Sequence, residues 1–244
     1  MAFTANSGPF LKFASICSFL GALTTALLIF VPDAVAEGFE QQVALHENSQ
    51  YLAKRWILFL HPQFNFIAAL GMGYLLFRKY PLQILLGLFF LGLWAVSEIT
   101  QQALVIDALN QIWRPGYAVA GSESDQALYR TLIQGAGGLS DTYYFLVIYG
   151  FGLGSLLFGL AFVHLGSWAR WIGWALIFIG ALSLASFARY YLGVTSLNGI
   201  VNGAYQWIYP YLQPLVRVAM GIWILGQLRW PHTGGNANGL KGVI

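Results

Sequence analysis

Two pairs of hydrophilic residues lie inside long apolar runs at a spacing that could build a binding site. His61 and Asn65 are four residues apart, and so are Gln213 and Arg217. Residues four apart share one face of a helix. Each pair is therefore expected to present an imidazole, amide or guanidinium group in one direction.

Glu98 lies deep in another apolar run, one helical turn from Gln101 and Gln102. An ionisable group inside a hydrocarbon layer costs about 2.5–3.5 kcal/mol on insertion scales, so it needs a partner or a wet cavity. We expect Glu98 to pair with Arg217, because both lie at a similar depth in their runs.

These positions predict a polar chamber that opens toward one face of the membrane. The alternative is that the side chains only tie helices together, through hydrogen bonds worth about 0.6 kcal/mol each. The predicted ligand-binding residues are His61, Asn65, Glu98, Gln101, Gln102, Arg189, Tyr209, Gln213 and Arg217.

The elements that would position this site are six apolar runs. Each is long enough to cross a bilayer core about 30 Å thick, which needs roughly 20 residues of helix. A helix also satisfies its own backbone hydrogen bonds in lipid. The runs cover residues 9–31, 56–77, 82–109, 142–165, 168–190 and 206–228.

The composition supports this interpretation. Apolar residues make up 58% of the 244 residues and charged residues only 9%, against about 25% in soluble domains. This excludes a soluble enzyme, a disordered chain and, with a net charge of only +3, a nucleic-acid binder. The single cysteine, Cys17, excludes a disulfide framework and a thiolate metal site.

The connections between the runs alternate in length. Two are short, at 78–81 and 166–167, and three are long, at 32–55, 110–141 and 191–205. The short-connection side carries basic residues and no acid, which favours the cytoplasm.

We therefore predict an all-α polytopic membrane protein with six transmembrane helices, cytoplasmic termini and long structured outer loops. The first run is expected to be a retained helix and not a cleaved signal peptide. Residues 1–230 would form one domain, and residues 231–244 a flexible cytoplasmic tail.

Local signals predict structure in the outer connections. Ser122 begins a capping-box pattern that Gly135 would end, which predicts a short interfacial helix. A second helix is expected within 36–52. Pro210 and Pro214 predict a kink in the outer half of the last helix.

The sequence contains none of the common catalytic motifs. His61 and His164 lie near opposite faces, so they cannot share a haem. No Walker A, HExxH or GxSxG motif is present. We expect no catalytic residue and no metal, and no cofactor is indicated beyond bound lipid.

Small residues at 150, 154, 155 and 159 predict close helix packing, with residues 173 and 180 on the next run. The segment 152–164 and the following Trp-Ala-Arg-Trp-Ile-Gly-Trp at 168–174 resemble a bacterial family of six-helix membrane proteins known only as a domain of unknown function. The resemblance covers part of the second half, and it implies no activity and no catalytic residues.

Two functions remain open from the sequence. The first is a non-catalytic accessory or scaffold subunit of a membrane complex. The second is a small-molecule or lipid binder, a transporter or a membrane-embedded enzyme that uses the chamber. The expected partners are membrane lipids and other membrane subunits or a second copy, and not nucleic acid, in a bacterial inner membrane or its equivalent.

Overall fold

The computed structural model describes residues 7–166 and 168–229, and these residues form helices and connections without a strand. The predicted all-α class is confirmed. The predicted tail, 231–244, lies outside the described residues. Four described helices are long and apolar enough to cross a membrane: Ser7–Phe30, Pro81–Val119, Glu123–Val163 and Ala169–Tyr191.

The predicted second and sixth spans differ from these four. The second corresponds to α3 (Ser49–Leu76), where His61, Pro62, Gln63 and Asn65 lower the hydropathy of the helix. The sixth is a bent pair of helices, which is long and apolar enough only when its two parts are taken together.

The long helices pack in chain order around a ring. This ring contains α1 (Ser7–Phe30), α3, α4 (Pro81–Leu104), α6 (Glu123–Val163), α7 (Ala169–Tyr191) and α9 (Tyr209–Arg229). Each packs on the next, and α9 packs on α1. Contacts are sparsest between α7 and α9, where α8 (Asn198–Trp207) fills one end of the gap.

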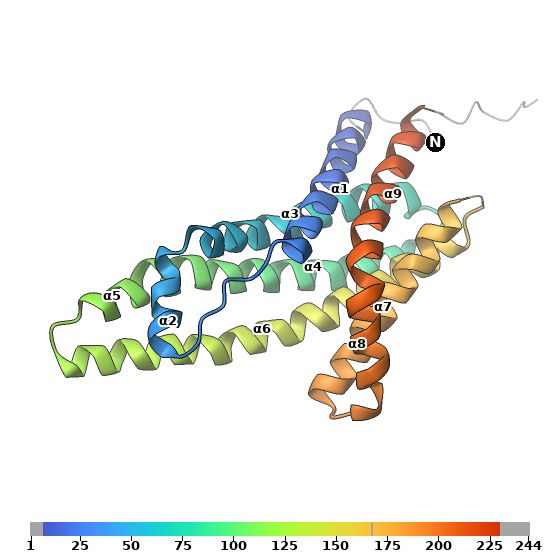
Figure 1. Cartoon of the computed structure of the whole chain (residues 1–244). Helices are drawn as coiled ribbons and strands as arrows, with labels where there is room; N and C mark the ends of the chain where they lie inside the picture. Colours follow the sequence, from blue (N-terminus) through green and yellow to red (C-terminus); the bar gives the residue numbers. More distant parts are fainter. Residues whose placement is uncertain (1–6, 167, 230–244) are drawn as a thin grey trace, which may run out of the picture.

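The two short turns, the start of α1 and the end of α9 all lie at one end of the ring. The rings of Tyr80 and His164, in the two short turns, lie 6.2 Å apart. Phe10 near the start of α1 lies 6.4 Å from Tyr74 near the end of α3. The start of α1 and the end of α9 lie together in Figure 1. Successive long helices therefore run in alternating directions.

The other end carries a long helical hairpin. The first arm continues from α4 through a π-helical stretch, η2 (Val105–Trp113), into α5 (Arg114–Val119), giving 39 residues without a break. The second arm is the first half of α6, which has 41 residues. At 1.5 Å per residue each helix is about 60 Å long, so both extend well past the other helices (Figure 1).

The predicted interfacial helix at 122–135 is wrong, although its start is confirmed. Ser122 caps α6 by accepting a hydrogen bond from the backbone N–H of Asp125 at 3.1 Å. The helix then continues through Gly135, because Ile133 and Ala136 are buried against the first arm of the hairpin. This packing offsets the cost of about 1 kcal/mol for a glycine inside a helix.

The segment between α1 and α3 packs against the hairpin. α2 (Phe39–Ala44) and the 3-10 turn η1 (Leu45–Glu47) cover it, and Val43 joins the cluster of buried hairpin side chains. The predicted helix within 36–52 is thus present only in pieces, which end before α3 starts at Ser49.

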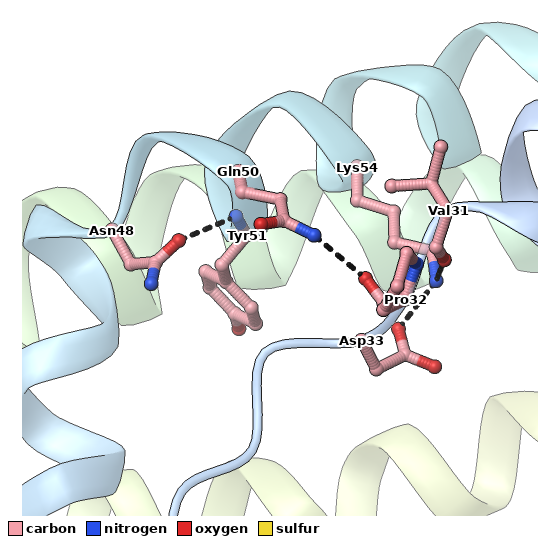
Figure 2. Close-up of polar contacts among 7 residues, drawn as sticks. All are labelled: Val31, Pro32, Asp33, Asn48, Gln50, Tyr51 and Lys54. Carbon is pink, nitrogen blue, oxygen red and sulfur yellow. Dashed lines mark hydrogen bonds and ion pairs between the residues drawn. The ribbon is translucent and has the colours of Figure 1, made fainter.

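The extended connection after α1 is fixed to the first turns of α3 (Figure 2). Lys54 Nζ donates to the Asp33 carboxylate and to the Val31 carbonyl, both at 2.7 Å. Gln50 donates to the Pro32 carbonyl at 2.9 Å. These bonds place the irregular chain on the outside of α3.

A bend is present near the start of the predicted last span, but it lies before both prolines, and α9 continues through Pro214. α8 and α9 meet at an angle of 58°, at Ile208. Pro210 is the second residue of α9, where a missing amide donor costs nothing. Pro214 lies inside α9 and removes one further donor.

Glycines allow the closest helix approach, as their spacing predicts. A Cβ built on Gly159 of α6 would lie 2.8 Å from the backbone nitrogen of Ile177 and 2.9 Å from the carbonyl of Gly173 on α7. A Cβ on Gly150 would lie 2.7 Å from the carbonyl of Phe90 on α4. The three helices α4, α6 and α7 therefore form a tightly packed block.

We predict that Gly159→Ala lowers the free energy of unfolding by about 1–3 kcal/mol, the usual cost of an overpacked core. Gly137→Ala in the same helix is the matched control, because nothing lies within 4 Å of its built Cβ. The control should be neutral or stabilise by up to about 1 kcal/mol. Unfolding in mixed micelles measures both values, and equal values would contradict close packing at Gly159.

Candidate functional site

A cavity of about 220 Å³ lies inside the ring of helices and touches α1, α3, α4, α6, α7, α8 and α9. Five of the predicted site residues line its wall: His61, Glu98, Tyr209, Gln213 and Arg217. Hydrophilic side chains that the sequence analysis singled out therefore gather around one cavity. We call this space the central cavity.

Arg217 is the centre of a hydrogen-bond chain along one wall. Its Nε donates to the Asn65 side-chain oxygen, and its Nη1 donates to the Gln213 side-chain oxygen. Gln213 in turn donates to the Tyr209 hydroxyl at 2.5 Å. Because Asn65 belongs to α3 and the others to α9, the chain joins two helices that make few other contacts.

The helical spacing seen in the sequence produces this arrangement. Gln213 and Arg217 point the same way along α9, as predicted for residues four apart. His61 and Asn65 do the same on α3, where the Asn65 amide donates to the His61 carbonyl at 2.8 Å. His61 Nδ1 also lies 3.0 Å from the Thr24 hydroxyl of α1.

Helix α1 also contacts the hydrogen-bond chain centred on Arg217. The Ser18 hydroxyl donates to the Arg217 carbonyl at 2.6 Å. A Cβ built on Gly21 would lie only 2.4 Å from the Asn65 side-chain oxygen. Glycine at position 21 therefore leaves the space in which Asn65 reaches Arg217.

The predicted ion pair between Glu98 and Arg217 is wrong. Both are buried, at 8% and 6% exposure, and both line the central cavity, but no ion pair joins them. The neutral amides of Asn65 and Gln213 take the place of a carboxylate beside the guanidinium. An acid and a base thus face the same cavity without direct contact.

Four of the predicted site residues do not line the central cavity, and one of these, Asn65, lines a smaller cavity beside it. Gln101 donates to the carbonyl and hydroxyl oxygens of Ser140 at 2.9 and 2.7 Å, which ties α4 to α6. Gln102 donates to Gln101 at 3.4 Å, and its own oxygen is buried without a partner. Arg189 donates to Asn202 near α8. The last helical turns of α4 and α7 rotate these side chains away from the cavity.

Other lining residues were missed by the sequence analysis. Trp94, Phe151, Tyr144, Tyr205 and Ser183 also contribute to the wall. Aromatic residues inside apolar runs resemble ordinary core residues, so no local signal marked them. Their presence makes the lining of the central cavity both aromatic and charged.

The central cavity has an apolar floor. A smaller cavity of about 40 Å³ adjoins it, and Trp94, Phe151 and Arg217 belong to both. Its other walls include Met72 and Phe158. This smaller cavity is mostly apolar, and its polar lining residues are Asn65, Ser155 and Arg217.

These groups can bind a polar molecule through charge and hydrogen bonds. The wall offers a carboxylate, a guanidinium, an imidazole and phenol hydroxyls. Within residues 7–166 and 168–229, no three His, Cys, Asp or Glu side chains gather closely enough to hold a metal ion.

Comparison with known proteins adds no relative. No protein-family model, curated protein or solved structure matches the chain. The resemblance of its second half to a bacterial six-helix family stays a prediction.

We predict that Asn65→Leu lowers the free energy of unfolding by about 1.5–3 kcal/mol. The substitution keeps the side-chain size but removes the acceptor of the buried Arg217 guanidinium, and hydrogen bonds to charged groups are worth this much. Unfolding in mixed micelles measures the loss.

Gln63→Ala on the same helix is the control, since the Gln63 amide bonds only to the Phe59 carbonyl one turn earlier. It should change stability by no more than about 0.5 kcal/mol. If both variants lose the same stability, Arg217 does not depend on Asn65.

Proposed function

We propose that the protein crosses the membrane six times and binds a small polar molecule in the central cavity. One observation supports this most: Glu98 and Arg217 are buried on the walls of one cavity, yet no ion pair joins them. Buried charges are costly unless they are paired, hydrogen-bonded or hydrated. Arg217 donates hydrogen bonds to the neutral side chains of Asn65 and Gln213, so a ligand with complementary charges would neutralise both buried charges.

The packing of α3 supports six spans. Its polar residues His61 and Asn65 are buried in the ring, so they do not meet lipid. The bent pair α8 and α9 completes the ring as the sixth element. Alternating helix directions then bring the start of α1 and the end of α9 to the side with the short basic turns, which favours the cytoplasm. The hairpin lies on the outer side.

The size and charge of the central cavity indicate the ligand class. Its volume of about 220 Å³ falls below the roughly 300–1,000 Å³ of sites for drug-sized molecules. A small zwitterion would place its cationic group near Glu98 and its anionic group near Arg217. The aromatic wall around Trp94 and Phe151 would contact an apolar substituent.

We predict that neutral L-amino acids at millimolar concentration raise the melting temperature of the purified protein in detergent. A ligand at 100 times its Kd stabilises the folded state by about 2.7 kcal/mol. Acetate and methylammonium, which carry one charge each, should have a smaller effect. The readout is thermal unfolding followed by tryptophan fluorescence.

The stabilisation should disappear in Glu98→Gln and in Arg217→Gln. Gln101→Ala should keep it, because Gln101 bonds to Ser140 and does not line the cavity. If zwitterions stabilise the protein no more than the singly charged compounds do, the proposed ligand class is wrong.

The hairpin favours a second function, that of a subunit in a membrane complex. A helix of 41 residues is about twice as long as a span requires. Large apolar side chains are exposed on the hairpin, including Val119 at 82% and Leu128 at 58%. Such exposed positions are suited to contact with another protein.

We predict that Val119→Glu combined with Leu128→Glu shifts the native protein in mild detergent from a larger assembly to a monomer. A buried charge at an interface costs several kcal/mol when unpaired, which is enough to dissociate a subunit. Native sizing measures the shift. Thr131→Glu, on an exposed polar position of α6, is the control that should leave the assembly intact. Migration of the unmodified protein as a monomer would contradict this second function.

A further inference from the structure

Two arginines from separate segments meet at one tyrosine where the hairpin leaves the ring. The guanidinium carbon of Arg55 on α3 lies 4.6 Å from the centre of the Tyr51 ring, and that of Arg114 on α5 lies 5.3 Å from it. Arg114 also donates to the Tyr51 hydroxyl at 3.1 Å and to the Asn110 side-chain oxygen at 2.5 Å. We call Tyr51, Arg55, Asn110 and Arg114 the Tyr51 cluster.

The Tyr51 cluster contains buried donors that have no acceptor. Nε of Arg55, Nε of Arg114 and Nδ2 of Asn110 are buried, and none forms a hydrogen bond. Arg114 and Asn110 are each 5% exposed. A buried donor without a partner costs about 1–3 kcal/mol, and more when it is charged. Three in one cluster call for an explanation such as a bound ion.

The acids around the Tyr51 cluster do not neutralise it. Asp33 is bound by Lys54 at 2.7 Å (Figure 2), and Glu40 is paired with Arg130 at 3.5 Å. Asp107 of η2 is exposed and forms no ion pair. Two positive charges therefore remain beside each other without a carboxylate.

The position of the Tyr51 cluster in the fold also favours the binding of an anion. The Asn48 side chain caps α3 by accepting from the Tyr51 amide at 2.9 Å, so the cluster lies at the positive end of a 28-residue helix. Trp56, next to Arg55, is 51% exposed. Tryptophan is enriched at the level of lipid headgroups.

We propose that the Tyr51 cluster binds an oxyanion of the phosphate class, which would be either the phosphate of an anionic lipid headgroup or free phosphate. The planar forks of two guanidinium groups match phosphate oxygens, and the Asn110 amide adds a neutral donor. This site is separate from the central cavity and does not depend on the ligand proposed there. The lipid source requires the proposed membrane crossing of α3, and free phosphate does not.

The test uses the full chain in detergent and measures binding in two arms. In the first arm, native mass spectrometry compares retention of phosphatidylglycerol with that of phosphatidylcholine of the same acyl chains. In the second arm, thermal unfolding compares sodium phosphate with sodium chloride at equal ionic strength. Preference for phosphatidylglycerol in the first arm supports the lipid source, and stabilisation only by phosphate in the second supports the free ion.

The variant Arg55→Gln with Arg114→Gln should reduce the preferred binding about tenfold or more, since a hydrogen bond between charged groups is worth about 1.5–3 kcal/mol. Arg130→Gln is the matched control, because Arg130 lies in the same hairpin but is paired with Glu40. It should leave binding unchanged.

Arg114→Lys tests the site if the double variant fails to fold. It keeps the charge but loses the planar fork, so binding should weaken while the fold persists. The proposal is overturned if neither arm shows a preference in the unmodified protein. It is also overturned if the preference persists in the double variant, or if Arg130→Gln removes it equally.

Discussion

The guanidinium of Arg217 imposes the main constraint on the ring of helices. A buried charge needs hydrogen-bond acceptors, and these come from Gln213 on its own helix and from Asn65 on α3. α1 contributes by bonding the Arg217 backbone through Ser18 and by making room for Asn65 at Gly21. Helices α1, α3 and α9 are thereby joined at one polar junction, and this junction forms a wall of the central cavity.

The rest of the ring is held by a different kind of contact. Glycines bring the backbones of α4, α6 and α7 close together, and α1, α3 and α9 meet both at glycines and through buried polar side chains. The central cavity lies between these two halves, where α7 and α9 make few contacts. Glu98 reaches the cavity from the glycine-packed half and Arg217 from the polar half, which explains why they face one another without pairing.

The sequence predicted the helices and the gathering of several polar side chains, because hydropathy and four-residue spacing indicate both directly. It could not predict the rotation of each helix about its axis, so Gln101 and Glu98 looked equivalent although only Glu98 lines the cavity. It also could not show that Asn65 would lie closer to Arg217 than Glu98 does. The hairpin was missed because its polar residues resemble those of a loop, while its packing comes from a buried cluster that brings Val105 and Ile133 together from distant segments.

The length of the two hairpin helices has a mechanical consequence. Glu98 and Tyr144 line the central cavity on the same unbroken helices that extend outward to Val119 and Glu123. A helix transmits a tilt along its whole axis, with small displacement near the pivot and large displacement at the tip. Because glycines pack α4 tightly on α6, a protein bound at the tip would move these two walls together, relative to α1 and α9 across the central cavity.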